Sequence, residues 1–278
     1  MPELPEAEVV AQQIRAHLLG AQIKDCWVGR ADIVREGLPT LPWYLGACLE
    51  RVERYGKSVA LGFQKENELR YVVAELGMTG LLLFRATQTK YPQHVHVRLS
   101  FTGGRESELR YWNPRRFGRL SLLDQAGLDR YRARRFGVDP LTVSRDEFIR
   151  LMEARRGRLK PLLMHQQVIA GIGNIYANEM LFRAKLHPNR EASRLRKAMI
   201  VRLYDTMQTV LREAIACGGS SVKDFFAPDG TEGHYKQHHL VYGKEGQPCP
   251  NRCGRIIRRL QSERSSFVCP TCQRKSRV

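Results

Sequence analysis

Four cysteines near the C-terminus have the spacing of a metal site. Cys249 and Cys253 are separated by three residues, Cys269 and Cys272 by two, and fifteen residues lie between the two pairs. Thiol pairs at this separation suit one tetrahedral Zn²⁺, and four thiolates form a closed, structural ligand set. A redox role is less favoured because no βαβ pattern surrounds either pair. The segment is also too poor in apolar residues to fold alone, so we predict one structural zinc ion.

A basic segment, RIIRRLQSERSSF, lies between the two cysteine pairs. We expect it to form a β-ribbon with Arg264 near its tip. A single arginine at such a place could be a solvated charge. The whole basic run, however, indicates contact with phosphate groups.

The N-terminal residues MPELPE could also carry chemistry. Removal of the initiator Met would leave the secondary amine of Pro2 at the chain end. An α-amino group has a pKa of about 8, against about 10.4 for lysine, so more of it is neutral and nucleophilic at pH 7. Glu3 could transfer a proton to or from whatever the amine attacks. Proline and acidic residues also open helices, and from the chemistry alone that structural role is favoured.

The histidines do not predict a second metal site. His94 and His96 lie two residues apart and would share one face of a strand, while three further histidines lie together in a later segment. No cysteine or carboxylate stands at a matching short spacing. We therefore interpret these histidines as isolated polar residues or as contacts with nucleic acid, and we take His94 as a candidate contact.

The charge of the chain points to a polyanionic partner. The 278 residues include 46 Lys and Arg against 28 Asp and Glu, which gives a net charge of +18. Nucleic acid is the first partner to consider. A membrane surface is less favoured because there is no basic amphipathic helix with an aromatic face. Neither a membrane span nor a signal peptide is apparent, so we expect a cytoplasmic protein. We also expect it to be a monomer.

The elements that must position these residues fall into two halves. A helix is expected over residues 6–19, followed by strands over about 22–123 that would form a β-sandwich or flattened barrel. The second half is expected to be helical, with helices starting near 145, over 174–184 and over 194–216. Ser144 with Glu147 has the pattern that begins the first of these helices. Residues 220–243 are expected to form a loop.

Five motifs in order cover almost the whole chain: MPELPEAEVV, LGMTG, NPRRFG, AGIGNIYANE and the four-cysteine tail. Together they resemble the formamidopyrimidine-DNA glycosylase family, which also includes endonuclease VIII. The resemblance implies an α+β protein with three parts. These are an N-terminal β-sandwich with a helix (1–132), a helix–two-turn–helix domain (133–240) and a C-terminal zinc finger (241–278).

The resemblance also implies a reaction on duplex DNA that carries a damaged base. Pro2 would attack C1′ of the damaged nucleotide and form a Schiff base, and Glu3 would assist opening of the sugar ring. Lys57 and Arg264 would bind phosphates beside the lesion. The expected activity is therefore that of a bifunctional DNA glycosylase and AP lyase.

The remaining matched residues would hold the DNA. A damaged base must leave the duplex to be reached, and the space it leaves must be filled. The residues that match the filling trio are Met78, Arg115 and Phe117. The residues that match contacts with the backbone or the flipped base are Lys160, Asn174 and Lys223.

Four departures from the family pattern accompany these matches. The first cysteine pair has three intervening residues instead of two, Glu75 stands in place of a His before LGM, Asn113 replaces an Asp before PRRFG, and His165 replaces an Asp. PELPE resembles the branch that excises oxidised purines. An endonuclease VIII-like enzyme for oxidised pyrimidines and a non-catalytic zinc-finger DNA-binding protein remain as alternatives.

Overall fold

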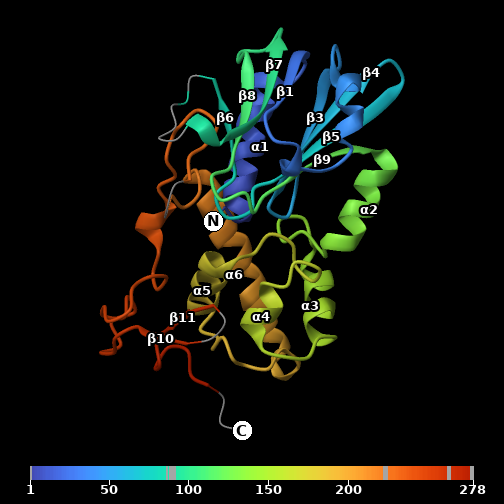
Figure 1. Cartoon of the computed structure of the whole chain (residues 1–278). Coiled ribbons are helices and arrows are strands. Elements are labelled where there is room, and N and C mark those ends of the chain that lie inside the picture. The colour runs from blue at the N-terminus through green and yellow to red at the C-terminus, as the bar shows by residue number, and fades with distance from the viewer. Residues whose placement is uncertain (1, 86, 88–91, 222–224, 262–263, 276–278) are drawn as a thin grey trace. The chain divides into compact units, whose positions relative to one another are not determined.

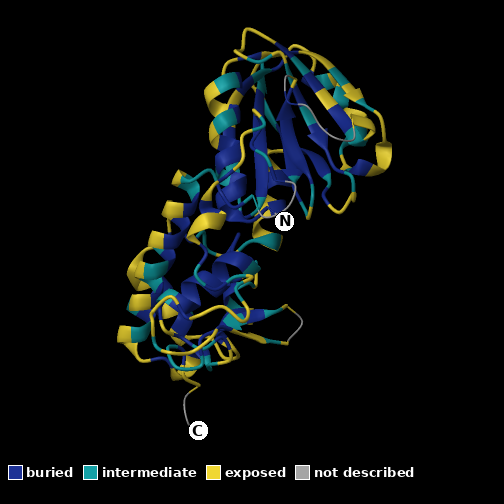
Figure 2. Cartoon of the chain, turned by 90° about the vertical axis from the view of Figure 1, so that its left-hand side faces the viewer, coloured by how far each residue is buried: buried dark blue, intermediate teal, exposed yellow. Residues whose placement is uncertain are grey.

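The computed structural model describes residues 2–85, 87, 92–221, 225–261 and 264–275, and it divides into two compact units (Figure 1). The first unit comprises Met1–Arg135 and Ile215–Lys236, and the second comprises Phe136–Ala214 and Gln237–Val278. The chain therefore leaves the first unit after Arg135 and returns to it at Ile215, and we call Ile215–Lys236 the returning segment. Each unit has its own buried interior (Figure 2).

The first unit is a β-sandwich. Its strands are β1 (Gln22–Val28), β2 (Val34–Glu36), β3 (Cys48–Tyr55), β4 (Ser58–Lys65), β5 (Glu68–Glu75), β6 (Leu81–Phe84), β7 (Val95–Thr102), β8 (Glu108–Trp112) and β9 (Leu120–Asp124). Among the described residues they pair in the order β2-β9-β5-β4-β3-β1-β7-β8-β6. The sheet folds over where β1 and β3 meet, since only Gln22 and Cys48 pair there. Its two arms pack face to face, with Leu61 and Val72 opposite Leu82 and Val97.

Helix α1 (Leu4–Leu18) packs against β3 and β4 of this sandwich. It begins two residues earlier than expected because Pro5 lies in its first turn, where a backbone N–H is not needed. Ala7, Val10 and Ile14 recur at helical spacing and are fully buried. The returning segment docks on the same helix, where Gln13 exchanges hydrogen bonds with Asp229.

Helix α2 (Gln125–Arg135) follows the last strand and was not expected from the sequence. It is rich in arginine and has only three buried residues, so its apolar periodicity is weak. Asp124 begins it by accepting a hydrogen bond from the backbone N–H of Gly127.

The second unit is mainly helical. Its helices are α3 (Arg145–Glu153), α4 (Leu159–Leu163), α5 (Asn174–Arg183) and α6 (Lys197–Ala216), and short 3₁₀ turns lie at Ala192–Arg194 and Tyr235–His238, the second crossing the boundary between the units. The side chain of Ser144 accepts a hydrogen bond from the N–H of Glu147 at the start of α3, as its sequence predicted. The face of α6 that carries Leu203, Met207 and Val210 is fully buried.

The C-terminal residues form a small antiparallel hairpin of β10 (Arg258–Leu260) and β11 (Ser266–Val268). It packs on the end of α5, where Phe182 shares a buried cluster with Cys249, Ile257 and Cys269. The expected α+β class is thus confirmed.

Short 3₁₀ turns in the first unit lie at Ala31–Ile33, Leu38–Tyr44 and Pro92–His94.

Candidate active site and nucleic-acid-binding residues

The N-terminal residues are held rigidly at the start of α1. Pro2 and Glu3 are both buried, and the backbone N–H that follows Pro2 donates to the Glu6 carboxylate at 2.8 Å. The other oxygen of Glu6 accepts a hydrogen bond from the backbone N–H of Ser220 at 2.7 Å. Gly219 allows this approach, because a side chain there would lie 2.9 Å from the Glu6 carboxylate. Glu6 therefore joins the chain start to the returning segment, a role that the sequence did not reveal.

Lys57 lies in the tight turn between β3 and β4. Its neighbour Gly56 has a φ of +57°, a left-handed conformation that glycine adopts without strain. The guanidinium of Arg54 donates to the carbonyl of Gly56 and supports the turn. The turn presents Lys57 as a half-buried side chain at the end of a rigid hairpin.

The predicted filling trio lies on two loops of the first unit. Met78 lies on the β5–β6 loop (residues 76–80), and Arg115 and Phe117 lie on the β8–β9 loop (residues 113–119). Met78 is 40% exposed and Phe117 is 59% exposed, whereas most large apolar side chains of this unit are buried. The guanidinium of Arg115 lies 5.0 Å above the centre of the Phe117 ring. Exposed apolar tips beside a cation are suited to insertion into a base stack.

Glu75 ends the strand that leads into the β5–β6 loop. Its two carboxylate oxygens each lie 3.1 Å from a guanidinium, one of Arg35 and one of Arg135. Burial raises the pKa of Glu75, and the charges of Arg35 and Arg119 oppose that rise. The residue that departs from the family pattern here thus pairs with arginines of β2 and α2, and Arg119 of the β8–β9 loop adds a third positive charge.

His94 is not on a strand, contrary to expectation. It ends the 3₁₀ turn Pro92–His94, and His96 lies two residues later in β7. Their rings are 6.4 Å apart in an edge-on arrangement. Pro92 favours the turn, so the extended conformation begins only at Val95.

The AGIG turn precedes α5 in the second unit. Gly171 has a φ of +88°, and its N–H donates to the side-chain oxygen of Gln166 at 2.8 Å. The amide nitrogen of Gln166 in turn donates to the carbonyl of Ile172. Asn174 is the first residue of α5, so its backbone lies at a helix N-terminus, a position suited to binding an anion. The sequence identified the glycines but not the bracing role of Gln166.

The four cysteines of the tail come together as predicted. Their Sγ atoms lie within 4.8 Å of one another, with 3.4 Å between Cys253 and Cys269 and 3.8 Å between Cys249 and Cys272. Tetrahedral zinc thiolate bonds of about 2.3 Å place sulfurs about 3.8 Å apart, so this set fits Zn²⁺. The extra residue in the first pair is accommodated by Arg252, whose φ of +53° closes the turn back onto Cys249.

Lys160 is buried beneath the C-terminal hairpin. Its ammonium donates to the carbonyls of Arg264 and Ser265 at 3.2 and 2.7 Å and to the hydroxyl of Ser266 at 2.9 Å. Only 3% of the residue is exposed, while the Arg264 residue is exposed above it. Asn178 adds a second link, because its side chain accepts from the N–H of Phe267.

The predicted residues are divided between the two units. The first unit carries the N-terminal pair, Lys57, His94 and the trio, and the second carries Lys160, Asn174, Arg264 and the cysteines. Lys223 lies outside the described residues.

None of the described helices is both long and apolar enough to cross a membrane.

The first unit carries a β-sandwich with a buried Pro2, and the second unit carries a glycine turn before α5 and a four-cysteine hairpin that fits Zn²⁺. Residues 1–120 match the family model for the formamidopyrimidine-DNA glycosylase N-terminal domain, 136–226 that for its H2TH domain, and 246–274 that for a zinc finger found in FPG and IleRS. The chain belongs to the formamidopyrimidine-DNA glycosylase family.

Individual relatives match over nearly the full length. Formamidopyrimidine-DNA glycosylases from Pelotomaculum thermopropionicum and Solibacter usitatus are 36% and 37% identical, and the alignments cover 99% of this chain and 99% and 100% of the relatives. The MutM (Fpg) crystal structure from Thermus thermophilus has a TM-score of 0.84 at 35% identity. Lactococcus lactis Fpg in complex with DNA containing N7-benzyl-Fapy-dG has a TM-score of 0.87 at 29% identity. Each of these structures aligns with 99% of this chain and 100% of its own.

Proposed function

We propose that this protein is a bifunctional DNA glycosylase and AP lyase that excises oxidised purines, 8-oxoguanine and formamidopyrimidines, in base-excision repair. The observation that carries the proposal is the buried chain start, where the N–H after Pro2 is fixed by the Glu6 carboxylate. A nucleophile held in one orientation loses little entropy when it attacks. The family membership supplies the substrate class.

The proposed reaction starts at the amine of Pro2. The neutral amine attacks C1′, the glycosidic bond breaks, and the damaged base leaves with a proton. Glu3 protonates the ring oxygen as the sugar opens, which leaves an iminium between Pro2 and C1′. Loss of a proton from C2′ expels the 3′ phosphate, and loss of a further proton from C4′ expels the 5′ phosphate. In this scheme Lys57 and Arg264 bind the phosphates.

DNA binding in this proposal begins with the positive charge of the chain. The flipped nucleotide leaves a gap that Met78 and Phe117 enter, while Arg115 bonds to the opposite base. Asn174 and the first turn of α5 bind a backbone phosphate, and His94 and Lys223 add further contacts. The zinc, bound by the four cysteines, holds the hairpin that carries Arg264. We expect a monomer that works inside the cell on the nucleoid.

Borohydride trapping tests the nucleophile. The Met1-processed protein should form a covalent adduct with 8-oxoguanine duplex under reduction, because borohydride reduces the iminium to a stable amine. Pro2→Gly and a form that retains Met1 should lose most of the adduct. Pro5→Ala is the matched control, since it alters the same helix start and keeps the terminal amine. Equal trapping by the Met1-retaining form would show that another group is the nucleophile.

A cleavage panel separates this function from its alternatives. Duplexes carrying 8-oxoguanine or formamidopyrimidine should be cut with a higher kcat/KM than a duplex carrying an oxidised pyrimidine. Preference for the pyrimidine lesion would favour an endonuclease VIII-like enzyme. Binding to every duplex without trapping on any would favour a non-catalytic DNA-binding protein.

A further inference from the structure

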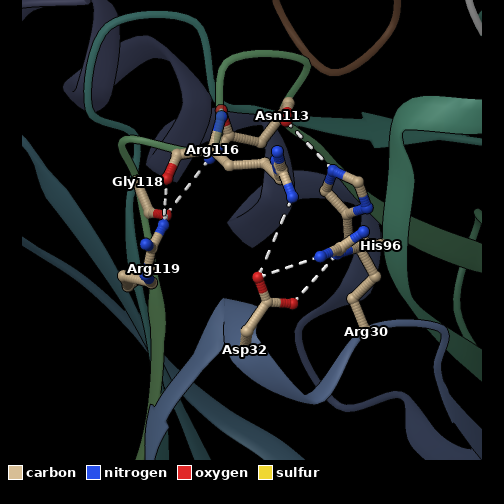
Figure 3. Close-up of polar contacts among 7 residues, drawn as sticks. All are labelled: Arg30, Asp32, His96, Asn113, Arg116, Gly118 and Arg119. Carbon is tan, nitrogen blue, oxygen red and sulfur yellow. Dashed lines mark hydrogen bonds and ion pairs between the residues drawn. The ribbon is translucent and has the colours of Figure 1, made fainter.

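Asn113 lies at the junction of the two loops that carry the filling trio. It directly follows β8, begins the β8–β9 loop, and is fully buried. Figure 3 shows its position beside His96 and Arg116. The sequence marked it only as a departure from the family pattern, where an acidic residue is usual. Its contacts assign it a specific part in holding these loops.

The carboxamide of Asn113 uses both its donors and its acceptor. Its nitrogen donates to the hydroxyl of Tyr111 at 3.0 Å and to the carbonyl of Gly118 at 3.2 Å. Its oxygen accepts from the backbone N–H of Arg116 at 3.0 Å and from the hydroxyl of Thr79 at 3.4 Å. Three of these bonds brace the β8–β9 loop and its strand, and the bond from Thr79 reaches the β5–β6 loop.

The backbone of Asn113 is held as well. Its N–H donates to the carbonyl of His94 at 2.9 Å, and its carbonyl receives a hydrogen bond from Nε2 of His96 at 3.0 Å. Burial lowers the pKa of His96. A neutral imidazole with its proton on Nε2 satisfies this contact.

Arg116, in the β8–β9 loop, turns its exposed side chain toward Asp32. Its φ of +53° is uncommon for a residue with a side chain, and its guanidinium lies 3.9 Å from Asp32. Asp32 is itself bound by Arg30 through contacts of 2.9 and 3.1 Å (Figure 3). The neighbouring Arg115 and Phe117 are left exposed at the tip.

The two loops also touch through their glycines. A side chain on Gly77 would lie 2.5 Å from the backbone nitrogen of Gly118, and one on Gly118 would lie 2.1 Å from the carbonyl of Glu75. That carbonyl accepts the Tyr111 hydroxyl at 2.7 Å. The loops are therefore packed backbone to backbone, and Asn113 closes the junction.

We propose that Asn113 is a positioning residue that couples the two loops, so that Met78 enters the base stack together with Arg115 and Phe117. The proposal rests on the proposed function, which assigns the trio to the gap left by the flipped nucleotide. A displacement of about 1 Å in such a group can cost about a hundredfold in rate. Loosening the junction should therefore weaken insertion into duplex DNA and the reading of the opposite base, while the chemistry at Pro2 stays intact.

The test compares Asn113→Ala with the wild type on two substrates. On a duplex with 8-oxoguanine opposite cytosine, we expect kcat/KM to fall by about tenfold to a hundredfold. On single-stranded abasic DNA, which has no opposite strand to support, cleavage should change by less than about twofold. A 2-aminopurine next to the lesion should report slower insertion, and the preference for cytosine over adenine opposite the lesion should shrink.

Two further variants and a control complete the design. Asn113→Asp keeps the acceptor for Arg116 and Thr79 but loses the donors, so its loss should be smaller than that of Asn113→Ala. Thr79→Val removes only the bond between the loops and should produce a partial loss even if Asn113→Ala fails to fold. Asn67→Ala, at an exposed site in the β4–β5 turn of the same sheet, should match the wild type.

The outcomes distinguish this proposal from the proposed function. Unchanged duplex cleavage and unchanged insertion in both Asn113→Ala and Thr79→Val would overturn the role of Asn113. Equal losses on single-stranded and duplex DNA by a folded variant would also overturn it, because the effect would then lie in the chemistry. A wild-type protein that cleaves neither substrate would instead refute the proposed function.

Discussion

Replacing Lys160 by methionine tests how this protein holds the arginine that is proposed to bind phosphate. Lys160 was expected to contact DNA, but its ammonium points into the protein and donates to three oxygens of residues 264–266. We therefore expect its contribution to DNA binding to pass through Arg264. Methionine keeps most of the buried apolar chain and removes the donors.

The structure allows the size of the effect to be estimated. A hydrogen bond to a charged group contributes about 1.5–3 kcal/mol, and a buried carbonyl left without a donor costs about 1–3 kcal/mol. Desolvation of the ammonium offsets part of this gain, so we expect a local loss of about 2–4 kcal/mol. If about 2 kcal/mol of the free energy that holds the hairpin tip in its binding position is lost, kcat/KM should fall by about thirtyfold.

A double-mutant cycle identifies the route of the effect. The kcat/KM for cleavage of an abasic duplex is measured for Lys160→Met, Arg264→Ala and the double variant. If Lys160 acts through Arg264, its replacement should have little further effect once Arg264 is gone. Lys197→Met, at the exposed start of α6, controls for the loss of one positive charge. A Lys160→Met effect of the same size in both backgrounds would refute the reasoning and indicate a direct phosphate contact.

Three further results are expected. Glu6→Gln leaves one acceptor oxygen for two N–H groups and should reduce borohydride trapping by about tenfold. Unchanged trapping would show that the Glu6 bridge does not position Pro2. Removal of zinc by a chelator should expose residues 246–274 to proteolysis and weaken duplex binding; resistance to the protease would argue against a structural zinc. Burial lowers the pKa of His96 from 6.5, so as the pH falls the unfolded chain binds the proton before the folded chain does. The stability that the neutral imidazole contributes is therefore lost below about pH 6.5. In urea unfolding measured on either side of pH 6.5, His96→Gln should show a smaller loss of stability than the wild type.

The sequence was informative where spacing alone fixes geometry. The cysteine spacings were sufficient to predict the four-sulfur cluster, because two short turns leave few ways to arrange four thiols around one ion. Helix α6 and the start of α3 were also predictable, since the apolar residues recur along one helical face and Ser144 supplies a local cap. Helix α2 was missed because four of its eleven residues are arginines and only three residues are buried, which leaves no clear apolar periodicity.

The sequence by itself determined the fold class, the zinc ligands and the motifs that reveal the family. The tertiary structure decided which charged residues are exposed and which hold the others in place. Lys160 and Arg264 are both basic in the sequence, yet one is buried beneath the other, because the ammonium meets backbone carbonyls more than a hundred positions away. Likewise Glu6 meets Ser220, and Asn113 meets Thr79, only after distant strands and loops have packed together. Such contacts depend on the path of the whole chain, and no local pattern of residue types records them.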